Sequence, residues 1–221
     1  MELLEAMQRR HSVRQYTDRP IDDAALSALR SEIEACNREG GLHIQLVTEE
    51  PKAFDSFMAH YGKFSGVRNY IALIGPRGAK LDELCGYYGE RLVLLAQQLG
   101  LNTCWVAMTY KKIPGAFQVA SGEKLTVVIA LGYGVTQGVA HTSRDPAAVS
   151  EPDSDAPDWF RSGVEAALLA PTAMNQQKFL LRREGDTVCA KALSGFYTKI
   201  DLGIVKYHFE LAAGRENFRW Q

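Results

Sequence analysis

The sequence predicts an α+β fold, with a three-layer α/β/α arrangement around a mixed, mainly antiparallel sheet. Helix-like and strand-like segments alternate along the 221 residues without the regular βαβ rhythm of a Rossmann unit. Near the C-terminus, Lys178–Arg182 and Thr187–Ala190 flank Glu184-Gly185-Asp186, which predicts a hairpin of two antiparallel strands. With 46% hydrophobic and 23% charged residues, the composition is that of an ordinary globular protein.

The first third of the chain contains two predicted helices and two predicted strands. Residues 3–7 have the spacing of a short amphipathic helix. Residues 22–37 have apolar side chains spaced by three and four, with Asp22 as the N-cap and a glycine pair after the end. We expect strands at His43–Val47 and Tyr70–Ile74.

The middle of the chain contains the longest predicted helix. Leucine and tyrosine side chains over Leu81–Leu99 form one apolar stripe, and Gly100 ends the helix. Cys104–Met108 and Leu125–Leu131 are short apolar runs with β-branched residues. Such runs predict buried strands.

The C-terminal third begins with a segment of low apolar content. Residues 145–157 are rich in Pro, Asp, Ser and Ala, which is typical of a linker and equally of a long surface loop within one domain. Asp158–Ala170 predicts a helix that Pro171 stops, and Asp201–Ala213 predicts a last helix with Asp201 as its N-cap. We expect a single domain over residues 1–221.

A short internal similarity offers a second view of the domain organisation. Leu29–Ala35 (LRSEIEA) resembles Phe160–Ala166 (FRSGVEA), and each predicted helix precedes a predicted strand. Chance is a fair explanation for so short a match. The alternative is an old duplication of a helix–strand unit, which predicts two pseudo-equivalent halves, residues 1–144 and 158–221.

Charge and hydropathy argue against several classes of function. The formal net charge of −1 gives no electrostatic reason to expect nucleic acid or an anionic membrane as a partner. The apolar runs are too short to span a bilayer, and the N-terminus lacks the pattern of a signal peptide. The cysteines lie far apart, without a CxxC pair or clustered histidines, which argues against a zinc site or disulfides. We therefore expect a soluble cytoplasmic protein without a metal site.

The segment Arg10-His11-Ser12-Val13-Arg14 places two guanidinium groups, an imidazole and a hydroxyl within a short stretch. Arginine binds phosphate bidentately and serine adds a neutral hydrogen bond, so this combination suits a phosphomonoester. A solvated basic stretch at a helix end has the same composition, and composition alone favours that simpler interpretation.

The segment 171–177, with the sequence PTAMNQQ, is more unusual. It interrupts an apolar helix with a turn that carries a hydroxyl and three amides before a strand begins. Such a turn can present backbone N–H groups and polar side chains to a ligand. An ordinary helix–strand loop that satisfies its own backbone explains the same residues equally well.

Together the two segments resemble the nitroreductase family, in which a phosphate-binding R-[RH]-S-x-[RK] element works with a PSAxNxQ-like turn. Further similarities lie between them, at the lysine of Tyr61-Gly62-Lys63, at Leu99–Val106 (LGLNTCWV) and at Ala130–Gly134 (ALGYG), followed by a basic loop at His141–Arg144. Each similarity is weak singly, but their shared order along most of the chain is specific. The resemblance implies a nitroreductase-like fold.

The resemblance also implies bound FMN, NAD(P)H as electron donor, and nitroaromatic or quinone-like acceptors. Near the pyrimidine edge of the flavin, a lysine cation would stabilise negative charge on the reduced ring, which is how a protein tunes this cofactor. Without the resemblance, we would interpret Lys63 as a solvent-exposed lysine and Trp105 as an aromatic residue of the core. The implied cofactor-binding residues are Arg10, His11, Ser12 and Arg14 at the phosphate and ribityl chain, Arg144 as a second phosphate ligand, Lys63 at the pyrimidine edge, Trp105, Val106 and Ala107 along the ring, and Pro171, Thr172, Ala173, Asn175 and Gln177 on the other side.

The sequence departs from the common family in the position of the turn. In common nitroreductases the turn follows soon after the first element, where this chain has Ala35–Gly41 instead. The late position and the closing segment Tyr197–Ile204 resemble a smaller branch of the family. In the common family the turn reaches the flavin of the partner subunit. With the turn late in this chain, the sequence is compatible both with a homodimer and with a monomer that has an intramolecular site. Lys178 stands where an aromatic residue often follows, which leaves the wall of the substrate pocket undefined.

No protein side chain is expected to act as a general acid. His60 and His208 are the remaining histidine candidates, and His208 is read as a satisfied core residue. No Ser/His/Asp or Cys/His set is indicated. The first hypothesis is therefore an FMN-dependent oxidoreductase. The alternatives are flavin-fragmenting or dehalogenating chemistry on the same scaffold, and a non-catalytic flavin-binding or sensing protein.

Overall fold

A computed structural model describes residues 1–221. The chain folds into two compact units, each assembled from separate segments. Unit 1 consists of Met1–Gln8, Asp82–Arg91 and His141–Gln221, and unit 2 consists of Arg9–Leu81 and Leu92–Ala140. Helix α4 (Leu81–Gln98) contributes Asp82–Arg91, most of its N-terminal half, to unit 1 and its C-terminal end to unit 2.

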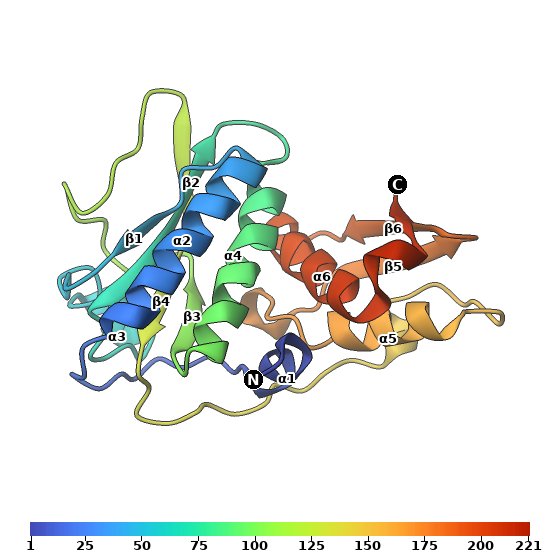
Figure 1. The fold of residues 1–221 in the computed structure, drawn as a ribbon, viewed down its shortest axis with the longest axis horizontal. Helices are drawn as coiled ribbons and strands as arrows, with labels where there is room; N and C mark the ends of the chain where they lie inside the picture. Colours follow the sequence, from blue (N-terminus) through green and yellow to red (C-terminus); the bar gives the residue numbers. More distant parts are fainter. The chain divides into compact units, whose positions relative to one another are not determined.

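Unit 2 contains an antiparallel sheet of four strands in the order β1-β2-β4-β3. Helix α2 lies across one face of this sheet (Figure 1). The longest strands are central, and the short β1 and β3 form the edges. The elements of this unit are α2 (Asp23–Gly40), β1 (Gln45–Val47), α3 (Phe57–Tyr61), β2 (Asn69–Pro76), β3 (Asn102–Val106) and β4 (Glu123–Gly132).

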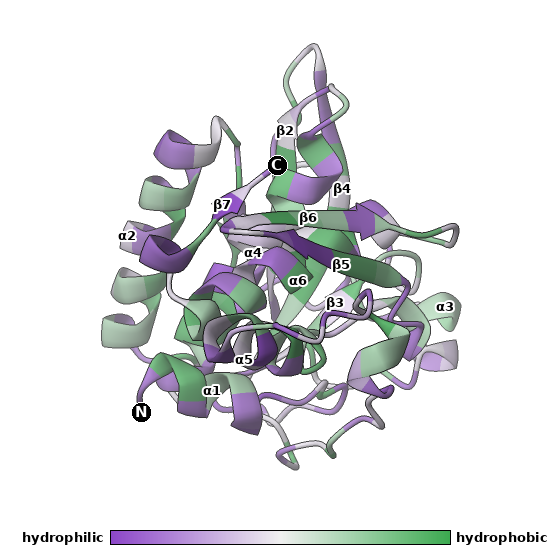
Figure 2. Ribbon diagram, turned by 90° about the vertical axis from the view of Figure 1, so that its right-hand side faces the viewer, coloured by the Kyte–Doolittle hydropathy of each residue, from purple (hydrophilic) through white to green (hydrophobic).

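The central strands of unit 2 are buried on both faces. In β2, Tyr70 and Ala72 point into a core that includes Phe54, whose ring centroid lies 5.9 Å from that of Tyr70. Ile71 and Leu73 point to the opposite face and are also fully buried. Figure 2 shows the resulting apolar colouring of β2 and β4. Burial on both faces explains why these strands read as continuous apolar runs in the sequence.

Unit 1 combines helices with a small second sheet. Strands β5 and β6 pair antiparallel as a hairpin, and β7 adds parallel to β6. Gly185 in the hairpin turn has a φ of 61°, a conformation that glycine adopts without strain. The elements are α1 (Leu3–Arg9), η1 (Pro146–Ala148), α5 (Asp158–Ala167), η2 (Ala173–Asn175), β5 (Phe179–Glu184), β6 (Thr187–Ala192), α6 (Thr198–Ala213), η3 (Arg215–Asn217) and β7 (Arg219–Trp220).

Helix α6 is the centre of unit 1. It packs against α5, where the rings of Phe160 and Phe209 lie 5.7 Å apart. It also meets the N-terminal part of α4 backbone to backbone, because a Cβ atom at Gly203 would lie 2.0 Å from the carbonyl oxygen of Glu83. This close approach requires glycine at the crossing point.

The predicted α+β class is confirmed, although the strands are divided between two sheets and do not form a single mixed one. The predicted helices near both termini and the hairpin are present within a few residues. Asp22 is the N-cap of α2, and its Oδ1 accepts a hydrogen bond from the Ala25 N–H at 2.8 Å. Both helices of the internal similarity, α2 and α5, precede strands. No helix is both long enough and apolar enough to cross a membrane.

Two sequence predictions need correction, and two short elements were missed. Helix α6 begins at Thr198, so Asp201 lies in its first turn and is not the N-cap, which is Tyr197. Helix α4 has no single buried stripe, since Glu90 and Val93 are fully buried while Tyr88 is half-buried; a helix buried on several sides loses the stripe pattern. The short α3 and β7 were not predicted, because five and two residues are too few to show a period.

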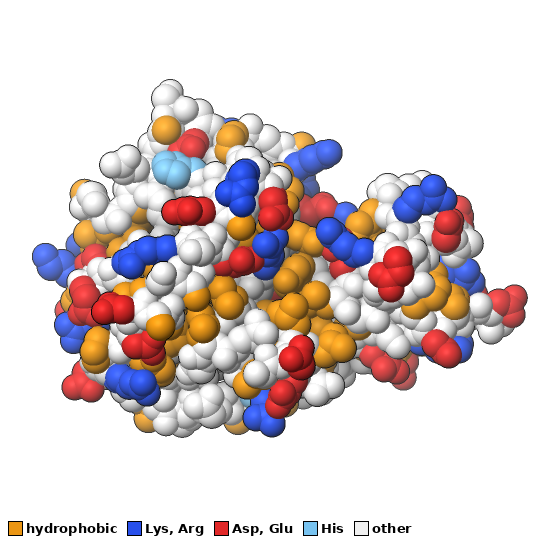
Figure 3. All heavy atoms as spheres, viewed as in Figure 1, with side chains coloured by type: hydrophobic (Ala, Val, Ile, Leu, Met, Phe, Trp, Pro, Cys, Tyr) orange, Lys and Arg blue, Asp and Glu red, His pale blue; other side chains and the backbone are white.

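Charges of both signs are spread over the face drawn in Figure 3. Lysine and arginine side chains alternate there with aspartate and glutamate, in keeping with the formal net charge of −1. This face therefore lacks the single-sign field by which proteins attract polyanions.

Candidate functional site

The segment Arg10–Arg14 runs beside the edge strand β3 of unit 2. Ser12 forms a parallel bridge with Thr103, and the Val13 N–H donates to the Thr103 carbonyl oxygen at 3.0 Å. The side chain of Arg10 is buried, whereas Ser12 and Arg14 are exposed. The backbone of the segment is thus held by the sheet, and part of its polar side chains faces outward.

Three of the predicted phosphate ligands converge on the thiol of Cys104 in β3. Burial raises the pKa of this thiol, while the Arg14 and Arg10 guanidinium groups and a hydrogen bond with Ser12 act in the opposite direction. Two cations and a hydroxyl therefore lie around one point beside the strand. Guanidinium and hydroxyl donors of this kind suit a phosphomonoester.

His11 is half-buried against the loop that follows β4. A Cβ atom at Gly138 would lie 2.8 Å from the Cβ atom of His11 and 3.0 Å from the carbonyl oxygen of Ser12. The φ of Gly138 is +74°. The loop therefore approaches the segment closely because position 138 has no side chain.

Lys63 precedes two residues of unit 2 that contact Arg14. The Ser65 N–H donates to the Arg14 carbonyl oxygen at 3.0 Å, and the Arg14 guanidinium lies 5.9 Å from the centroid of the Phe64 ring. Lys63 itself is exposed and has a φ of 61°, in the left-handed region. The turn after α3 thus carries an exposed lysine one residue before the Phe64 ring that lies near Arg14.

The predicted ring-lining residues are at the end of β3. Val106 is buried in the core of unit 2, and Trp105 and Ala107 are half-buried. Unit 2 therefore contains all the predicted cofactor-binding residues from Arg10 to Ala107. Arg144 and the segment Pro171–Gln177 belong to unit 1.

Pro171–Gln177 forms a tight turn between α5 and β5. Met174, Asn175 and Gln177 have φ values of 53°, 52° and 46°. Such left-handed conformations are strained for residues other than glycine, less so for asparagine. The Gln177 N–H donates to the Thr172 hydroxyl oxygen at 3.0 Å, which closes the turn.

Side-chain amides join this turn to the segment 142–144. Gln177 is 2% exposed; its Oε1 accepts from the Arg144 N–H at 2.8 Å, and its Nε2 donates to the Thr142 carbonyl oxygen at 2.9 Å. Asn175 Nδ2 donates to the same carbonyl at 2.9 Å. The structure thus brings Arg144 to the turn, as one hydrogen-bonded assembly. These hydrogen bonds occupy many of the donors and acceptors of the Asn175 and Gln177 side chains.

Asp201 contacts the turn, and the sequence analysis missed it as a site residue. Its Oδ1 accepts from the Ala173 N–H at 3.0 Å, and its Oδ2 accepts from Gln176 Nε2 at 2.8 Å. Burial raises the pKa of the carboxyl to about 6, although both hydrogen bonds favour the ionised form. Twenty-eight positions separate Asp201 from Ala173, so no local pattern links them. The resemblance of the segment Tyr197–Ile204 to a family branch was the available signal.

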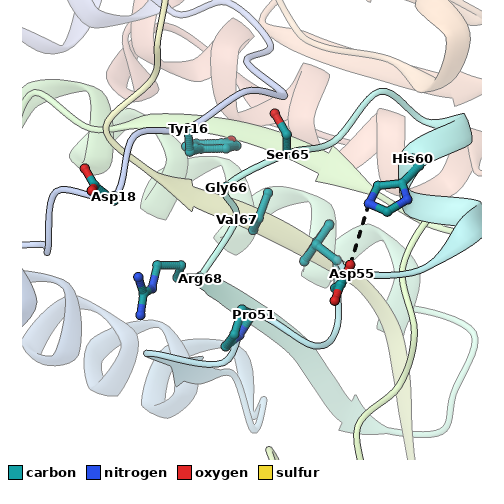
Figure 4. A pocket seen from close by; sticks show the side chains of 10 residues that line it. Tyr16, Asp18, Pro51, Asp55, His60, Ser65, Gly66, Val67 and Arg68 are labelled. Atoms are coloured by element: carbon teal, nitrogen blue, oxygen red, sulfur yellow. Dashed lines mark ion pairs between the residues drawn. The ribbon is translucent and has the colours of Figure 1, made fainter.

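Unit 2 also contains an open hollow of about 490 Å³ (Figure 4). This size is typical of small-molecule sites. Buried aromatic and aliphatic side chains form its floor, and exposed charged residues form its rim. None of the predicted cofactor-binding residues lines it, so it gives no support to the predicted flavin site. The lining residues are Tyr16, Asp18, Pro51, Phe54, Asp55, His60, Ser65, Gly66, Val67 and Arg68.

The two histidine candidates have opposite surroundings. His60 lies on the rim of the hollow, with its Nε2 3.7 Å from Asp55 Oδ1 (Figure 4); both side chains are largely exposed, so the pair stabilises little. His208 is fully buried, with Nδ1 3.1 Å from the Ala166 carbonyl oxygen and Nε2 2.9 Å from Glu90 Oε1. The interpretation of His208 as a satisfied core residue is confirmed.

The sequence matches, over residues 2–213, the family model described as "Putative TM nitroreductase". Solved structures that are similar to this chain include the following three. A "putative nitroreductase" from Thermotoga maritima is 23% identical, with a TM-score of 0.67 over 98% of this chain and 85% of its own. A "Putative NADH dehydrogenase/NAD(P)H nitroreductase" from Parabacteroides distasonis is 21% identical, with a TM-score of 0.53 over 70% of this chain and 98% of its own.

The third is a "putative nitroreductase in complex with FMN" from Desulfovibrio desulfuricans. It is 20% identical, with a TM-score of 0.50 over 67% of this chain and 94% of its own. None of the curated proteins matches the sequence. The family model spans nearly the whole chain, and the Thermotoga maritima structure shares its fold. The chain therefore belongs to the nitroreductase family described as "Putative TM nitroreductase".

Proposed function

We propose that this protein is an FMN-dependent oxidoreductase that takes electrons from NAD(P)H and passes them to nitroaromatic or quinone-like acceptors. The convergence of Arg10, Ser12 and Arg14 beside β3 is the observation that carries the proposal. Membership of the nitroreductase family supports it. So do the printed descriptions of two proteins of the same fold, one in complex with FMN and one named an NADH dehydrogenase/NAD(P)H nitroreductase.

The donor set of unit 2 fits the phosphate end of FMN. A phosphomonoester carries close to two negative charges at neutral pH, and two guanidinium groups match that charge. The exposed Arg14 and Ser12 would contact the phosphate and the ribityl oxygens, and the buried Arg10 would add positive potential behind them. His11 would contribute from the same segment, through its backbone or its ring.

Other residues of unit 2 would serve the ring of the cofactor. Bound FMN would supply the two-electron chemistry, and the protein would supply orientation and electrostatics. The exposed Lys63 would place a positive charge where negative charge collects on reduction. The half-buried Trp105 and Ala107, with Val106 between them, would line the ring.

We further propose that Arg144 and the turn contact the cofactor from a second side. In this proposal Arg144 is a second phosphate ligand, and Pro171, Thr172, Ala173, Asn175 and Gln177 form the opposing wall. A single chain or a partner copy in a homodimer would supply this wall. Mixing an Arg14→Ala variant with an Asn175→Ala variant distinguishes the two cases, because only a shared dimeric site regains flavin binding on mixing.

Flavin binding is tested by adding FMN to the purified protein and measuring its absorbance band and its Kd. Arg14→Ala should weaken binding by about tenfold or more, because a charge-assisted hydrogen bond contributes roughly 1.5–3 kcal/mol. Arg30→Ala is the matched control, since Arg30 is an exposed arginine on α2 of the same unit. Equal Kd values for wild type and Arg14→Ala would contradict the assigned phosphate site.

Electron transfer is tested anaerobically on the FMN-loaded protein. Addition of NADH or NADPH should bleach the flavin band, and a quinone or a nitroaromatic compound should restore it. Bleaching without reoxidation by either acceptor would contradict the acceptor class. A protein that binds no FMN at all would contradict the whole proposal.

A further inference from the structure

The turn at 171–177 has an unusual backbone for its sequence. Three of the four residues 174–177 have positive φ values, and none of them is glycine. Each such residue costs free energy that surrounding contacts must offset. The turn therefore depends on groups outside its own backbone to keep this shape.

A buried carboxylate on another element provides those contacts. Asp201, in the first turn of α6, accepts hydrogen bonds from the Ala173 N–H at 3.0 Å and from Gln176 Nε2 at 2.8 Å. It is 4% exposed. The two donors lie on either side of the left-handed residues Met174 and Asn175, so the carboxylate bridges the strained part of the turn.

The orientation of the Gln176 amide is set from two sides. Its Nε2 also donates to the Phe196 carbonyl oxygen at 2.7 Å. Its Oε1 lies against Gly195, where a Cβ atom would come within 2.5 Å of it. A flipped amide would turn its oxygen toward two acceptors, Asp201 and the Phe196 carbonyl, and lose both hydrogen bonds.

Both groups that face Asp201 are donors, so the site matches an ionised carboxylate. A protonated carboxyl would direct its own O–H toward either the Ala173 N–H or the Gln176 amide. A donor would then face a donor, and at least one hydrogen bond would be lost.

We propose that Asp201 is a positioning residue that holds the turn 171–177, together with the attached segment 142–144, in the shape that receives the cofactor. The link from the turn to 142–144 runs through Gln177, which bonds to Arg144 and Thr142. The reference to a cofactor rests on the proposed function, whereas the hold on the turn does not.

This arrangement makes the turn sensitive to pH. Burial raises the pKa of Asp201 to about 6, and the opposing causes are the two hydrogen bonds from the turn. Two charged side chains are near in sequence, Lys199 on α6 and Lys178 just before β5, and neither is a cause of the shifted pKa of Asp201. Burial outweighs these hydrogen bonds, and an open turn would return the carboxyl to its ordinary pKa of 3.8. The closed turn therefore binds the proton more tightly than the open one, and we expect the turn to loosen as the pH rises through about 6.

Amide hydrogen exchange in the cofactor-free protein tests the hold directly. Protection of the Ala173 amide should fall by up to about tenfold from one pH unit below to one pH unit above the pKa of Asp201, after correction for intrinsic exchange, because only the closed turn holds the proton in this range. Asp201→Asn, which cannot ionise, should remove this dependence. Glu165→Gln, at an exposed carboxylate of α5 in the same unit, should keep the wild-type profile.

Flavin affinity provides the second readout. If the wild type binds FMN, Asp201→Ala should raise the Kd several-fold, and the pH dependence of Kd near pH 6 should be absent in Asp201→Asn. Circular dichroism checks that the variants fold. If they do not, the pH dependence of Ala173 amide protection in the wild type tests the proposal alone. Protection that is independent of pH in the wild type, or unchanged pH dependence in Asp201→Asn, would overturn the proposal. Absence of FMN binding by the wild type would instead refute the proposed function and leave the exchange test valid.

Discussion

Replacing Gly203 by alanine tests the tightest helix contact in unit 1. A Cβ atom there would lie 2.0 Å from the Glu83 carbonyl oxygen and 2.6 Å from the Tyr87 backbone nitrogen. Both are backbone atoms of α4, so no side-chain rotation relieves the clash. Overpacking of this kind typically costs 1–3 kcal/mol and more where backbone must move, so it exceeds the roughly 1 kcal/mol that alanine gains over glycine in a helix. We expect the free energy of unfolding to fall by about 2 kcal/mol or more.

Urea denaturation followed by tryptophan fluorescence measures this change. Gly78→Ala is the control, because Gly78 has no atom within 4 Å of its Cβ position and its backbone is not left-handed. Its effect should stay within about 0.5 kcal/mol. The reasoning would be refuted if Gly203→Ala were as stable as the wild type or more stable, since helix propensity alone would then decide.

Three further outcomes follow from buried polar groups. The folded pKa of about 6 at Asp201 lies above the ordinary 3.8. This raised pKa therefore stabilises the folded protein by up to about 3 kcal/mol at pH values below 3.8. The contribution is lost as the pH rises through the folded-state pKa of about 6. Asp201→Asn should remove this component from the pH dependence of urea unfolding, and an unchanged pH profile would contradict it. His208→Ala should lower the free energy of unfolding by about 3–5 kcal/mol, because it leaves the fully buried Glu90 without its imidazole partner; a loss below about 1 kcal/mol in thermal or urea unfolding would contradict this expectation. The buried Cys104, whose pKa is raised, should react with a disulfide reagent more slowly than the half-buried Cys189, as mass mapping of the first labelled cysteine would show.

Local patterns predicted the elements whose signal lies within a few residues. The cap at Asp22, the start of α2 and the hairpin turn at Gly185 each depend on a side chain or a backbone conformation at that position. The apolar runs of β2 and β4 indicated strands for a similar reason, because each run is buried on both faces. These predictions survived in the structure because no distant contact competes with them.

The start of α6 shows where local patterns fail. An aspartate before an apolar helical stretch is a frequent N-cap. Here the helix begins earlier, and the Asp201 carboxylate bonds to the turn at Ala173 and Gln176. A capping residue and a long-range hydrogen-bond acceptor have the same sequence signature, so only the fold distinguishes them.

The sequence likewise predicted only part of the candidate site. Two arginines and a serine in one short segment already indicated a phosphate site, and the resemblance of several ordered motifs indicated the family, which the comparisons confirm. The role of each residue in the PTAMNQQ turn stays a prediction, because hydrogen bonds within unit 1 engage the same side chains that a ligand would use.

By itself, the sequence determined the α+β class, most helices and strands, and the nitroreductase family. The tertiary structure alone decided that Arg10, Ser12 and Arg14 meet at Cys104, that Gln177 ties Arg144 to the turn, and that Asp201 holds that turn from α6. The physical reason is the range of the interactions. Helix periods, caps and turns act over a few residues, whereas these contacts join residues that are far apart in the chain and become neighbours only when the backbone has folded.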